Sequence, residues 1–455
     1  MRSYLRAPSL DDKFWRDPER VSRVAALTPS ISDAQYYHWE ELRHRTPPAG
    51  VEALDWWYAL KLKRSMSARS YAELQGFGGR PLTVSMIAAM DAQLAQCDRQ
   101  LAGEIAHQNV PLDAQTRDRY LSSALMEEAI HSSLFEGAVS TREIAKDMLR
   151  EQRAPINQYE RMIVNNHRAM LHLRELAKQP LTVEAVLNLH AILVDGTLKH
   201  PDQAGRIQSP SDERIVVWDQ KSQSAVHTPP AADELPQRME RLIAFANGDD
   251  IEGDRYTHPV LRSILLHFQL AFDHPFADGN GRTARALFYW SMLRSNYWLA
   301  RYLSISSVIH RSPAAYKRAY LYSESDGNDL GYFIEHQLDV MERAFENLMQ
   351  YIQRKRAERR DGAGLLRADS RFGASLNHRQ RRLLEHALRH ADQAYTIAAH
   401  QQRHAVTYQT ARTDLLDLSE RGLMEMRKEG RAFTFFAPHD LADRIRLAGK
   451  QKSET

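Results

Sequence analysis

The sequence has a single cysteine, Cys97, and this scarcity excludes an internal disulfide framework. Disulfides persist in oxidising compartments, so their absence fits a reducing one. The cysteine falls in an apolar series with heptad-like spacing, Ile87, Met90, Leu94 and Leu101. Because free cysteine behaves as a small hydrophobic residue, we interpret Cys97 as part of the core and not as a reactive thiol.

Long hydrophobic runs are absent as well. The apolar stretch ILLHFQLAF is far too short to span a bilayer. The N-terminus, MRSYLRAPSLDDKFW, lacks the apolar segment of a signal peptide. The sequence therefore predicts a cytoplasmic protein with no membrane segment.

The chain also lacks a marked excess of charge of one sign. It contains 61 Lys and Arg against 58 Asp and Glu, a formal net charge of +3. Such a balance indicates no particular partner, and any basic patch must be local. A length of 455 residues with 43% hydrophobic and 26% charged residues is typical of a soluble protein with two or three domains.

The pattern along the chain is mainly helical. Residues 1–80 form an irregular, aromatic-rich N-terminal extension that we expect to pack on a neighbouring domain. Residues 81–350 have helical periodicity, interrupted by a lone hairpin at 214–228. A charged linker follows at 351–374, and residues 375–445 predict three short helices and a hairpin, the order of a winged helix-turn-helix.

The stretch DHPFADGNGRTAR, residues 273–285, places two arginines where a helix begins. A helix N-terminus carries partial positive charge, and Arg282 and Arg285 share one face of that helix, so the arrangement requires an anion. The preceding residues, 279–281 (Gly-Asn-Gly), let successive N–H groups point into one concavity. Guanidinium groups bind phosphate through two hydrogen bonds. The stretch therefore predicts a site for more than one phosphate.

Two further residues of this stretch add chemistry. Asp278 would repel phosphate unless a cation such as Mg²⁺ bridges them. His274 can act as a general base near neutral pH. A P-loop is excluded, because GNGRT lacks its lysine and its loop length. The combination indicates phosphoryl or nucleotidyl transfer.

The segment HPFADGNGRTAR resembles the signature of Fic proteins, H-x-F-x-D/E-G-N-G-R-x-x-R, at every defined position. The resemblance extends over about residues 128–338. It implies a mainly helical Fic fold with a small β-hairpin flap. It also implies an enzyme that moves AMP from ATP onto a Ser, Thr or Tyr hydroxyl of a target protein and releases pyrophosphate.

The resemblance assigns a role to each matched residue. His274 resembles the base that deprotonates the target hydroxyl, and Asp278 resembles the ligand of Mg²⁺ on the α- and β-phosphates. Arg285 resembles the arginine that holds the γ-phosphate, while Phe276 packs inward. The remaining phosphate-binding residues by this resemblance are Gly279, Asn280, Gly281 and Arg282. The hairpin at 214–228 resembles the flap on which a target protein, unknown here, docks by strand addition.

A glutamate upstream breaks a local rule. On the predicted helix near 120–137, Glu136 prolongs a largely apolar face and Gly137 ends the helix. An acid at the negative end of a helix costs about 0.3–1 kcal/mol when exposed, and broken local rules mark functional sites. SSLFEG resembles the inhibitory motif of Fic proteins, S/T-x-x-x-E-G/N, through Ser132, Glu136 and Gly137. By that resemblance Glu136 pairs with Arg285 and occupies the place of the γ-phosphate.

The predicted winged helix leaves two kinds of partner open. Its third helix, TYQTARTDLLDLSERGL, would be the recognition helix, with further basic residues on the hairpin. The residues that favour DNA are Tyr408, Gln409, Thr410, Arg412, Arg427, Lys428 and Arg431. Against DNA, Asp414 and Asp417 lie along the same helix. Winged helices also bind proteins or dimerise, so a protein partner or a homodimer stays open.

Several functions fit the motif. The leading hypothesis is an autoinhibited protein adenylyltransferase. The same site could remove AMP from modified proteins, with Glu136 orienting water, or transfer another phosphate-containing group. In a different class, the chain could be a DNA-binding regulator whose Fic core senses nucleotide.

Overall fold

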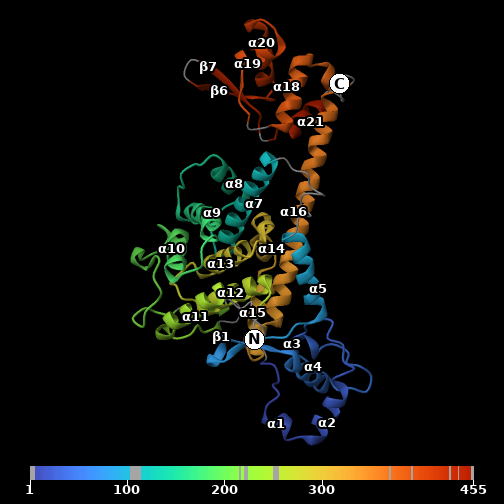
Figure 1. Cartoon of the computed structure of the whole chain (residues 1–455), viewed down its shortest axis with the longest axis vertical. Helices are drawn as coiled ribbons and strands as arrows, with labels where there is room; N and C mark the ends of the chain where they lie inside the picture. Colours follow the sequence, from blue (N-terminus) through green and yellow to red (C-terminus); the bar gives the residue numbers. More distant parts are fainter. Residues whose placement is uncertain are drawn as a thin grey trace. The chain divides into compact units, whose positions relative to one another are not determined.

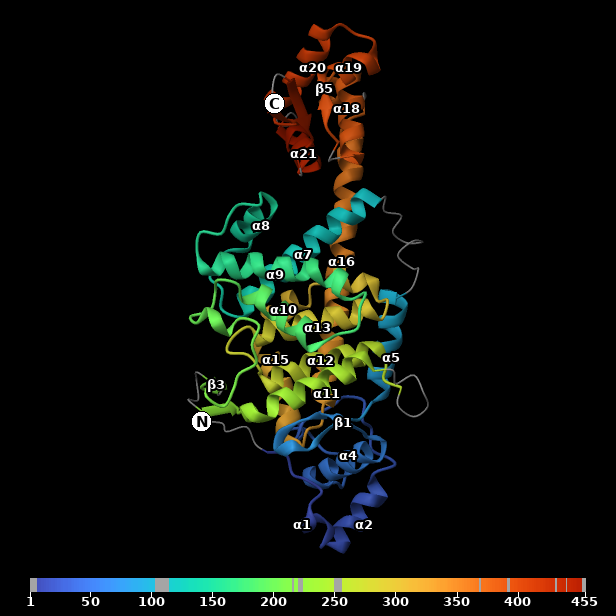
Figure 2. The same cartoon turned by 60° about the vertical axis from the view of Figure 1, so that its left-hand side comes forward.

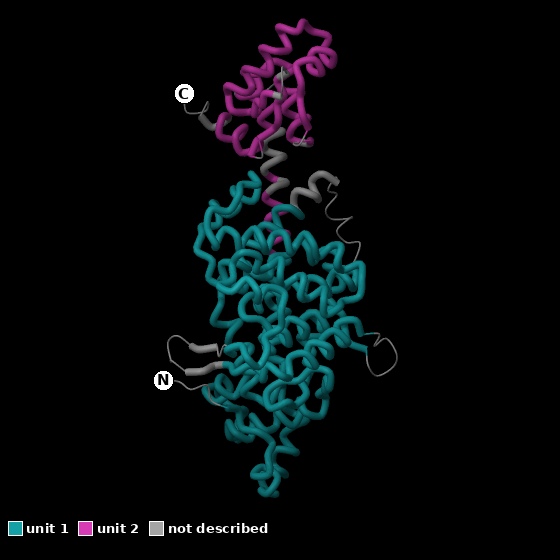
Figure 3. The backbone as a smooth tube through the Cα atoms, turned by 90° about the vertical axis from the view of Figure 1, so that its left-hand side faces the viewer, with its two compact units in different colours: residues 1–345 teal, residues 346–455 magenta. Residues whose placement is uncertain are grey.

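The computed structural model divides into two compact units, Met1–Phe345 and Glu346–Thr455 (Figure 3). The structure describes residues 6–102, 114–214, 217–219, 224–248, 256–367, 370–390, 393–429, 432–438 and 440–451. Within these residues, no helix combines the length and the apolar character needed to cross a membrane.

The N-terminal residues are largely helical, which corrects the expectation of an irregular extension. The helices are α1 (Asp12–Trp15), α2 (Pro18–Leu27), α3 (Trp39–Leu42) and α4 (Ala53–Ser67). Asp11 and Asp17 cap the first two through their side chains. Trp57 and Leu60 of α4 are buried in a cluster with Val24 of α2. The apolar residues of α4 are spread around the helix, so its sequence shows little helical periodicity.

This N-terminal region packs on the rest of its unit, as expected from its aromatic content. The Tyr36 hydroxyl donates to Asp329 Oδ1 at 2.9 Å, and Lys61 Nζ lies 2.9 Å from Asp326 Oδ2. The Arg64 guanidinium donates to the Tyr332 hydroxyl. Buried ionic contacts of this kind join segments far apart in the sequence.

A second hairpin, at residues 69–84, lies mostly in the N-terminal segment that the sequence predicted to be irregular. Strand β1 (Arg69–Gln75) pairs antiparallel with β2 (Pro81–Val84). The turn between them has Gly78 and Gly79 at φ 69° and 68°, in the left-handed region that favours glycine. Strand β1 is largely polar and β2 has only four residues, so neither strand is evident from the sequence.

The centre of the first unit is a pair of buried helices, α12 (Pro259–Asp273) and α13 (Asn280–Arg294), joined by the loop 274–279 (Figures 1 and 2). The helices around this pair are α7 (Ala114–Phe135), α9 (Gln158–Leu176), α10 (Val183–Val194), α11 (Leu235–Asn247), α14 (Ile305–Arg311) and α15 (Pro313–Ser325). Outside them lie α5 (Ala88–Cys97) and α8 (Arg142–Arg150), and α16 (Gly331–Leu365) crosses the boundary of the two units in sequence. Cys97 is buried and burial raises the pKa of its thiol to about 12, so the prediction of a core cysteine is confirmed.

The hairpin predicted at 214–228 is present as β3 (Val217–Asp219) and β4 (Ser224–His227). Residues 215–216 and 220–223 lie outside the described residues. The fold is thus mainly helical with small sheets, as the sequence predicts.

The second unit contains the elements expected for 375–445. They are α18 (His378–Arg389), α19 (Ile397–His404), α20 (Tyr408–Glu420), β6 (Glu425–Glu429) and β7 (Ala432–Phe436). Three elements were not anticipated, namely α17 (Arg371–Ala374), β5 (Tyr395–Thr396) and α21 (Leu441–Gln451). The strands form a sheet in the order β5-β7-β6. Phe435 of β7 is buried in one hydrophobic cluster with Leu384 of α18 and Leu415 of α20. Residues 430–431, at the turn of the hairpin, lie outside the described residues, and the winged-helix assignment stays a prediction.

Candidate active site

The loop 274–279 is bounded by two left-handed residues. His274 ends α12 at φ 49°, with its N–H on the carbonyl of Leu270 at 3.1 Å. Gly279 precedes α13 at φ 81°, and a Cβ at this position would lie 2.7 Å from Val194 Cγ1. Both the backbone angle and the close approach of Val194 therefore require glycine here.

Asn280 and His190 hold this loop in place. The Asn280 side chain accepts from the Phe276 N–H at 2.9 Å and donates to the Phe276 carbonyl at 2.7 Å. Phe276 is fully buried, as predicted, and its ring stacks on His190 with centroids 3.8 Å apart. The His190 Nδ1 accepts from the Gly205 N–H, so Nε2 carries the proton and donates to the Asp278 carbonyl at 2.9 Å. Burial lowers the pKa of His190 to about 4, which keeps the ring neutral.

The two arginines of the motif lie buried in the first turns of α13, each 1% exposed. Arg282 donates to the Leu193 carbonyl at 3.0 Å and to Asp278 Oδ2 at 3.3 Å. Arg285 donates through Nε to Ser132 Oγ at 2.9 Å. Arg282 Nε and Arg285 Nη1 have no hydrogen-bond partner among the described residues. Burying a guanidinium N–H group without a hydrogen-bond acceptor costs free energy of folding. Such groups therefore suit an anion that accepts hydrogen bonds from them.

In this structure the carboxylate of Glu136 is the anion that Arg285 binds. Glu136 follows the last residue of α7, and Gly137 turns the chain at φ 93°. The Glu136 carboxylate, 27% exposed, accepts from Arg285 Nη2 at 2.9 Å. A Cβ at Gly281 would lie 2.1 Å from Glu136 Oε1, so the carboxylate lies directly on the first turn of α13. Burial by itself lowers the pKa of Arg285, but Glu136, Tyr316 and Glu128 together raise the pKa above its ordinary value.

The imidazole of His274 has a defined tautomer. Its Nδ1 lies 3.3 Å from the Ala271 carbonyl, which can only accept, so Nδ1 carries the proton and Nε2 keeps a lone pair. Burial lowers the pKa of His274 below its ordinary value. The side chain is therefore a neutral base at pH 7.

Asp278 is the residue that could hold a metal ion. Its carboxylate is 57% exposed, and Oδ1 accepts from the Gly279 N–H at 2.6 Å. Within the described part of the chain, no cluster of three or more His, Cys, Asp or Glu side chains could enclose a metal ion. Mg²⁺ commonly binds one or two carboxylates together with waters and substrate phosphates. A single open carboxylate beside an anion site fits that ion.

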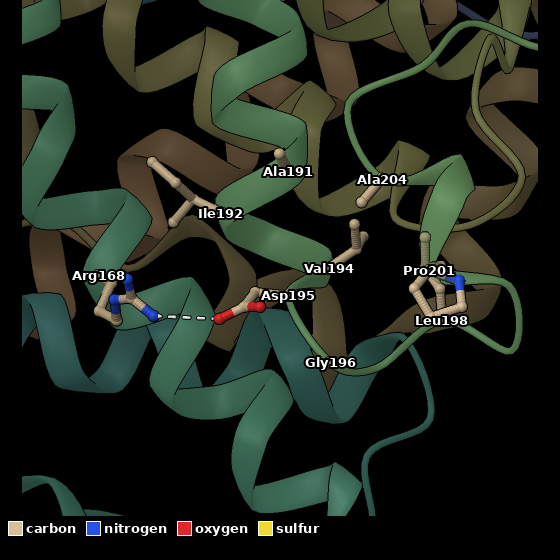
Figure 4. A pocket seen from close by; sticks show the side chains of 9 residues that line it. All are labelled: Arg168, Ala191, Ile192, Val194, Asp195, Gly196, Leu198, Pro201 and Ala204. Atoms are coloured by element: carbon tan, nitrogen blue, oxygen red, sulfur yellow. Dashed lines mark hydrogen bonds and ion pairs between the residues drawn. The ribbon is translucent and has the colours of Figure 1, made fainter.

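A pocket of about 330 Å³ opens at the C-terminal end of α10 (Figure 4). Most of its wall is apolar, with Ile192 and Leu198 among the lining residues, and the Arg168–Asp195 ion pair lies at one side at 3.4 Å. Both partners of that pair are more than half exposed, which limits its contribution to well under 1 kcal/mol. Val194 lines this pocket, and its Cγ1 also lies close enough to Gly279 to exclude a Cβ there.

The structure therefore brings all predicted site residues to one end of α13. It adds three residues that sequence reasoning missed. They are His190 on α10, and Arg214 and His227 at the two ends of the flap. The only sequence signal for the last two is their position at the ends of the hairpin.

Buried arginine N–H groups at a helix N-terminus, beside a neutral imidazole, form the kind of site that suits a phosphate or another anion. Residues 180–292 match the family model described as the Fic/DOC family. The match begins before α10 and ends within α13, and it includes the whole loop 274–279.

Similar proteins carry a common name. The protein adenylyltransferase Fic of Nematostella vectensis is 25% identical over 199 residues, 42% of this chain and 42% of that protein. The Drosophila grimshawi protein of the same name is 25% identical over 293 residues, 63% of this chain and 55% of its own length. The Drosophila melanogaster protein is 38% identical over 71 residues, which cover 16% of this chain and 14% of that one. The chain thus spans about half the length of the first two of these relatives.

Solved structures also resemble the chain. A Fic family protein from Desulfovibrio desulfuricans G20 has a TM-score of 0.48 at 19% identity, covering 78% of this chain and 97% of that one. Fic-1 of C. elegans, residues 134–508, has a TM-score of 0.47 at 16% identity, with 73% and 80% covered.

Proposed function

We propose that the protein transfers AMP from ATP to a hydroxyl side chain of a target protein and releases pyrophosphate. The name shared by its relatives supports this function. The observation that carries it is the neutral His274 imidazole, with a free Nε2, beside two buried arginines that have unsatisfied N–H groups. A base next to a site for phosphates is the arrangement that nucleotidyl transfer requires.

In the proposed reaction, His274 Nε2 takes the proton of the target hydroxyl as its oxygen attacks the α-phosphate. The bond from that phosphorus to the β-phosphate oxygen breaks, and pyrophosphate leaves. Arg282, Arg285 and the N–H groups at the start of α13 bind and neutralise the phosphates, so positioning and charge account for most of the catalysis. Asp278 would hold Mg²⁺, which would neutralise further phosphate charge when bound.

We propose that Glu136 inhibits this reaction in the resting chain. Its carboxylate takes a hydrogen bond of Arg285 and fills the space over Gly281. A phosphate group cannot occupy the same position, and two anions so close would repel each other. ATP would then bind only with its γ-phosphate displaced, out of line for attack.

Three purified forms test both parts of the proposal: the wild type, Glu136→Gly, and Glu136→Gly combined with His274→Ala. Each is incubated with Mg²⁺ and α-labelled ATP, and label on the chain itself and on added lysate is measured. We expect strong labelling only in Glu136→Gly. Labelling in no form, with ATP binding retained, would contradict AMP transfer. Equal labelling of wild type and Glu136→Gly would contradict only the inhibitory role.

The same forms test AMP removal. A protein carrying AMP is incubated with each form, and free AMP is measured. If Glu136 orients a water for this reaction, the wild type releases AMP and Glu136→Gly does not. Labelling by Glu136→Gly in the first assay, without release of AMP by the wild type in the second, supports AMP transfer as the main activity.

We also propose that the second unit binds double-stranded DNA. Residues 346–455 contain 21 Lys and Arg against 14 Asp and Glu, whereas residues 1–345 contain 40 against 44. The basic charge of the chain is therefore local to this unit. Tyr408, in the first turn of α20, is 54% exposed, next to the exposed Gln409. Arg427 and Lys428 of β6 are also exposed.

The acids that oppose DNA binding are paired within the unit. Asp414 is buried and accepts from Arg379 Nε at 2.6 Å, and Asn377 and His400 bind the same carboxylate. Asp417 is also paired, with hydrogen bonds from a glutamine of α18 and an arginine at the end of α20. Neither carboxylate is left as an isolated charge that would repel phosphate.

Fluorescence anisotropy of the full chain with a duplex of random sequence tests this proposal at several salt concentrations. Replacing Arg427 and Lys428 by Ala should weaken binding and lower the salt slope by about 1 for each lost phosphate contact. Arg174→Ala with Lys178→Ala, two exposed positions of the first unit, is the control and should change nothing. Absence of salt-dependent binding, together with dimerisation through this unit, would favour the protein-facing alternative.

A further inference from the structure

The end of α12 has an unusual set of hydrogen-bond partners. The last carbonyls of a helix receive no hydrogen bond from N–H groups within the helix, so they need donors from elsewhere. Here four successive carbonyls, from Phe272 to Pro275, accept hydrogen bonds from Arg214 and His227, at the two ends of the flap, and from Gln208, which precedes the flap. The bonds run from His227 Nε2 to Phe272 O (2.7 Å), Arg214 Nη2 to Asp273 O (2.9 Å), Arg214 Nη1 to His274 O (2.8 Å) and Gln208 N to Pro275 O (2.8 Å).

Arg214 joins three segments through one guanidinium group. Besides the end of α12, it donates to Gln208 Oε1, before the flap, and through Nε to the Pro230 carbonyl, after it, at 3.1 Å. A cation also interacts favourably with the negative end of a helix. The two ends of the flap and the residue preceding the loop are therefore held as one assembly.

His227, the last residue of β4, makes the matching contact from the other end. Its Nε2 donates to the Phe272 carbonyl, and its Nδ1 lies 2.9 Å from Glu324 Oε1 on α15. Both partners accept, so both ring nitrogens carry protons and the ring is charged. Burial by itself lowers the pKa of His227, but the Glu324 carboxylate, the Phe272 carbonyl and Asp273 together raise the pKa above its ordinary value.

These contacts bear directly on His274. Its left-handed backbone, at φ 49°, is uncommon for a residue other than glycine and persists where the surroundings hold it. The carbonyls of Asp273 and His274, on either side of its Cα, are both held by Arg214. The backbone angle in turn directs the imidazole so that Nδ1 reaches the Ala271 carbonyl.

We infer that Arg214 and His227 are positioning residues for His274, and that they couple the flap to the base. They do not touch the reacting atoms. They hold the end of α12 so that His274 presents an unprotonated Nε2. A target strand bound on the flap would act on the same contacts, so target docking and alignment of the base would occur together. This inference rests on the proposed function, but it concerns a geometry that can be measured without turnover.

The first experiment measures the tautomer of His274 by ¹⁵N NMR of the imidazole nitrogens in the full chain. The variants are Arg214→Met, which removes the donors but keeps the length, and His227→Gln. Arg206→Met is the matched control, because Arg206 lies in the same segment and its guanidinium binds Asp212. We expect a single Nδ1–H form in the wild type and in Arg206→Met, and a mixture of forms in the other two.

The second experiment measures AMP transfer with these substitutions in the Glu136→Gly background. We expect kcat to fall by about 10- to 100-fold for Arg214→Met, with KM for ATP within about twofold, since misplacing a base affects the chemical step. Arg214→Lys, which can reach one carbonyl, should recover part of the loss. If Arg214→Met fails to fold, the kcat of Arg214→Lys tests the positioning role of Arg214 instead.

An unchanged His274 tautomer in Arg214→Met and His227→Gln would overturn the inference, whatever the activity. Equal kcat losses for Arg214→Met and Arg206→Met would also overturn it, because the effect would then be a general one. If Glu136→Gly itself transfers no AMP, the proposed function fails and the NMR result still decides the positioning role.

Discussion

At the scale of single residues, the Glu136 carboxylate occupies the space that a side chain at Gly281 would need. An alanine at 281 would place its Cβ 2.1 Å from Glu136 Oε1, the far end of a flexible side chain. We therefore expect Gly281→Ala to displace the Glu136 carboxylate at a cost of about 1–3 kcal/mol in stability.

The same substitution tests what the carboxylate replaces. If it lies where a phosphate binds, the methyl group blocks that phosphate too. Glu136→Gly with Gly281→Ala should then be inactive in AMP transfer although Glu136→Gly alone is active. ATP titrations of both variants provide the measurement, and full activity of the double variant would show that the phosphate lies elsewhere.

The base itself has a predictable pH dependence. The pKa of His274 is lowered mainly by burial, while Glu136 raises it and the cations His227 and Arg214 lower it. A base must be deprotonated to act, so activity should rise through this pKa, which lies below the ordinary histidine value of about 6.5, and level off above it. Removing Glu136 removes the one charge that raises the pKa.

The measurement is kcat against pH for Glu136→Gly at saturating ATP and Mg²⁺. We expect the acid limb to have its midpoint below about pH 6.5. A midpoint above that value would contradict the buried, neutral state of His274.

At the scale of elements, α10 supports the loop 274–279 through one side chain. His190 stacks on Phe276 and donates to the Asp278 carbonyl. His190→Phe keeps a ring for stacking but leaves that carbonyl without its donor. We expect a loss of about 1–3 kcal/mol in the free energy of unfolding, measured by urea denaturation of the first unit.

His172→Phe on α9 provides the control, since His172 is exposed and contributes no contact to the loop. A similar loss for both variants would mean that the hydrogen bond to Asp278 contributes nothing specific.

At the scale of the whole molecule, buried charges attach the N-terminal helices to the domain that contains the site. Lys61 lies 2.9 Å from Asp326 and 3.5 Å from Asp329, and all three are largely buried. Lys61→Met would leave two buried carboxylates without their cation. We expect a loss of about 3–5 kcal/mol, because the removal of one partner leaves uncompensated charge.

Calorimetry of the full chain checks this prediction. Because the two units are separate, the transition of Met1–Phe345 should move to lower temperature and that of Glu346–Thr455 should not. Lys63→Met, which removes a contact with the Ile31 carbonyl only, should have a much smaller effect. Equal shifts of both transitions would contradict the division into units.

The sequence anticipated the parts of the protein that depend on local spacing. The residues 278–285 act through a single helix terminus, and the three-residue separation of Arg282 and Arg285 places both on one face wherever that helix lies. The hairpin at 214–228 and the elements of 375–445 follow from short-range periodicity. Among the N-terminal elements, α1 and α3 have only four residues each, the apolar residues of α4 are not confined to one face, and the strands β1 and β2 are short, so the sequence did not reveal them.

The sequence by itself determined the prediction of an anion site at the start of α13, since the motif is contiguous and its geometry is that of one helix terminus. Only the tertiary structure decided which groups surround that site. The Glu136–Arg285 pair is separated by 149 residues, and it was expected from family resemblance and not from spacing. His190, Arg214 and His227 came from the structure alone. The physical reason is that contacts between elements depend on how buried faces pack, which the local pattern of one chain does not specify.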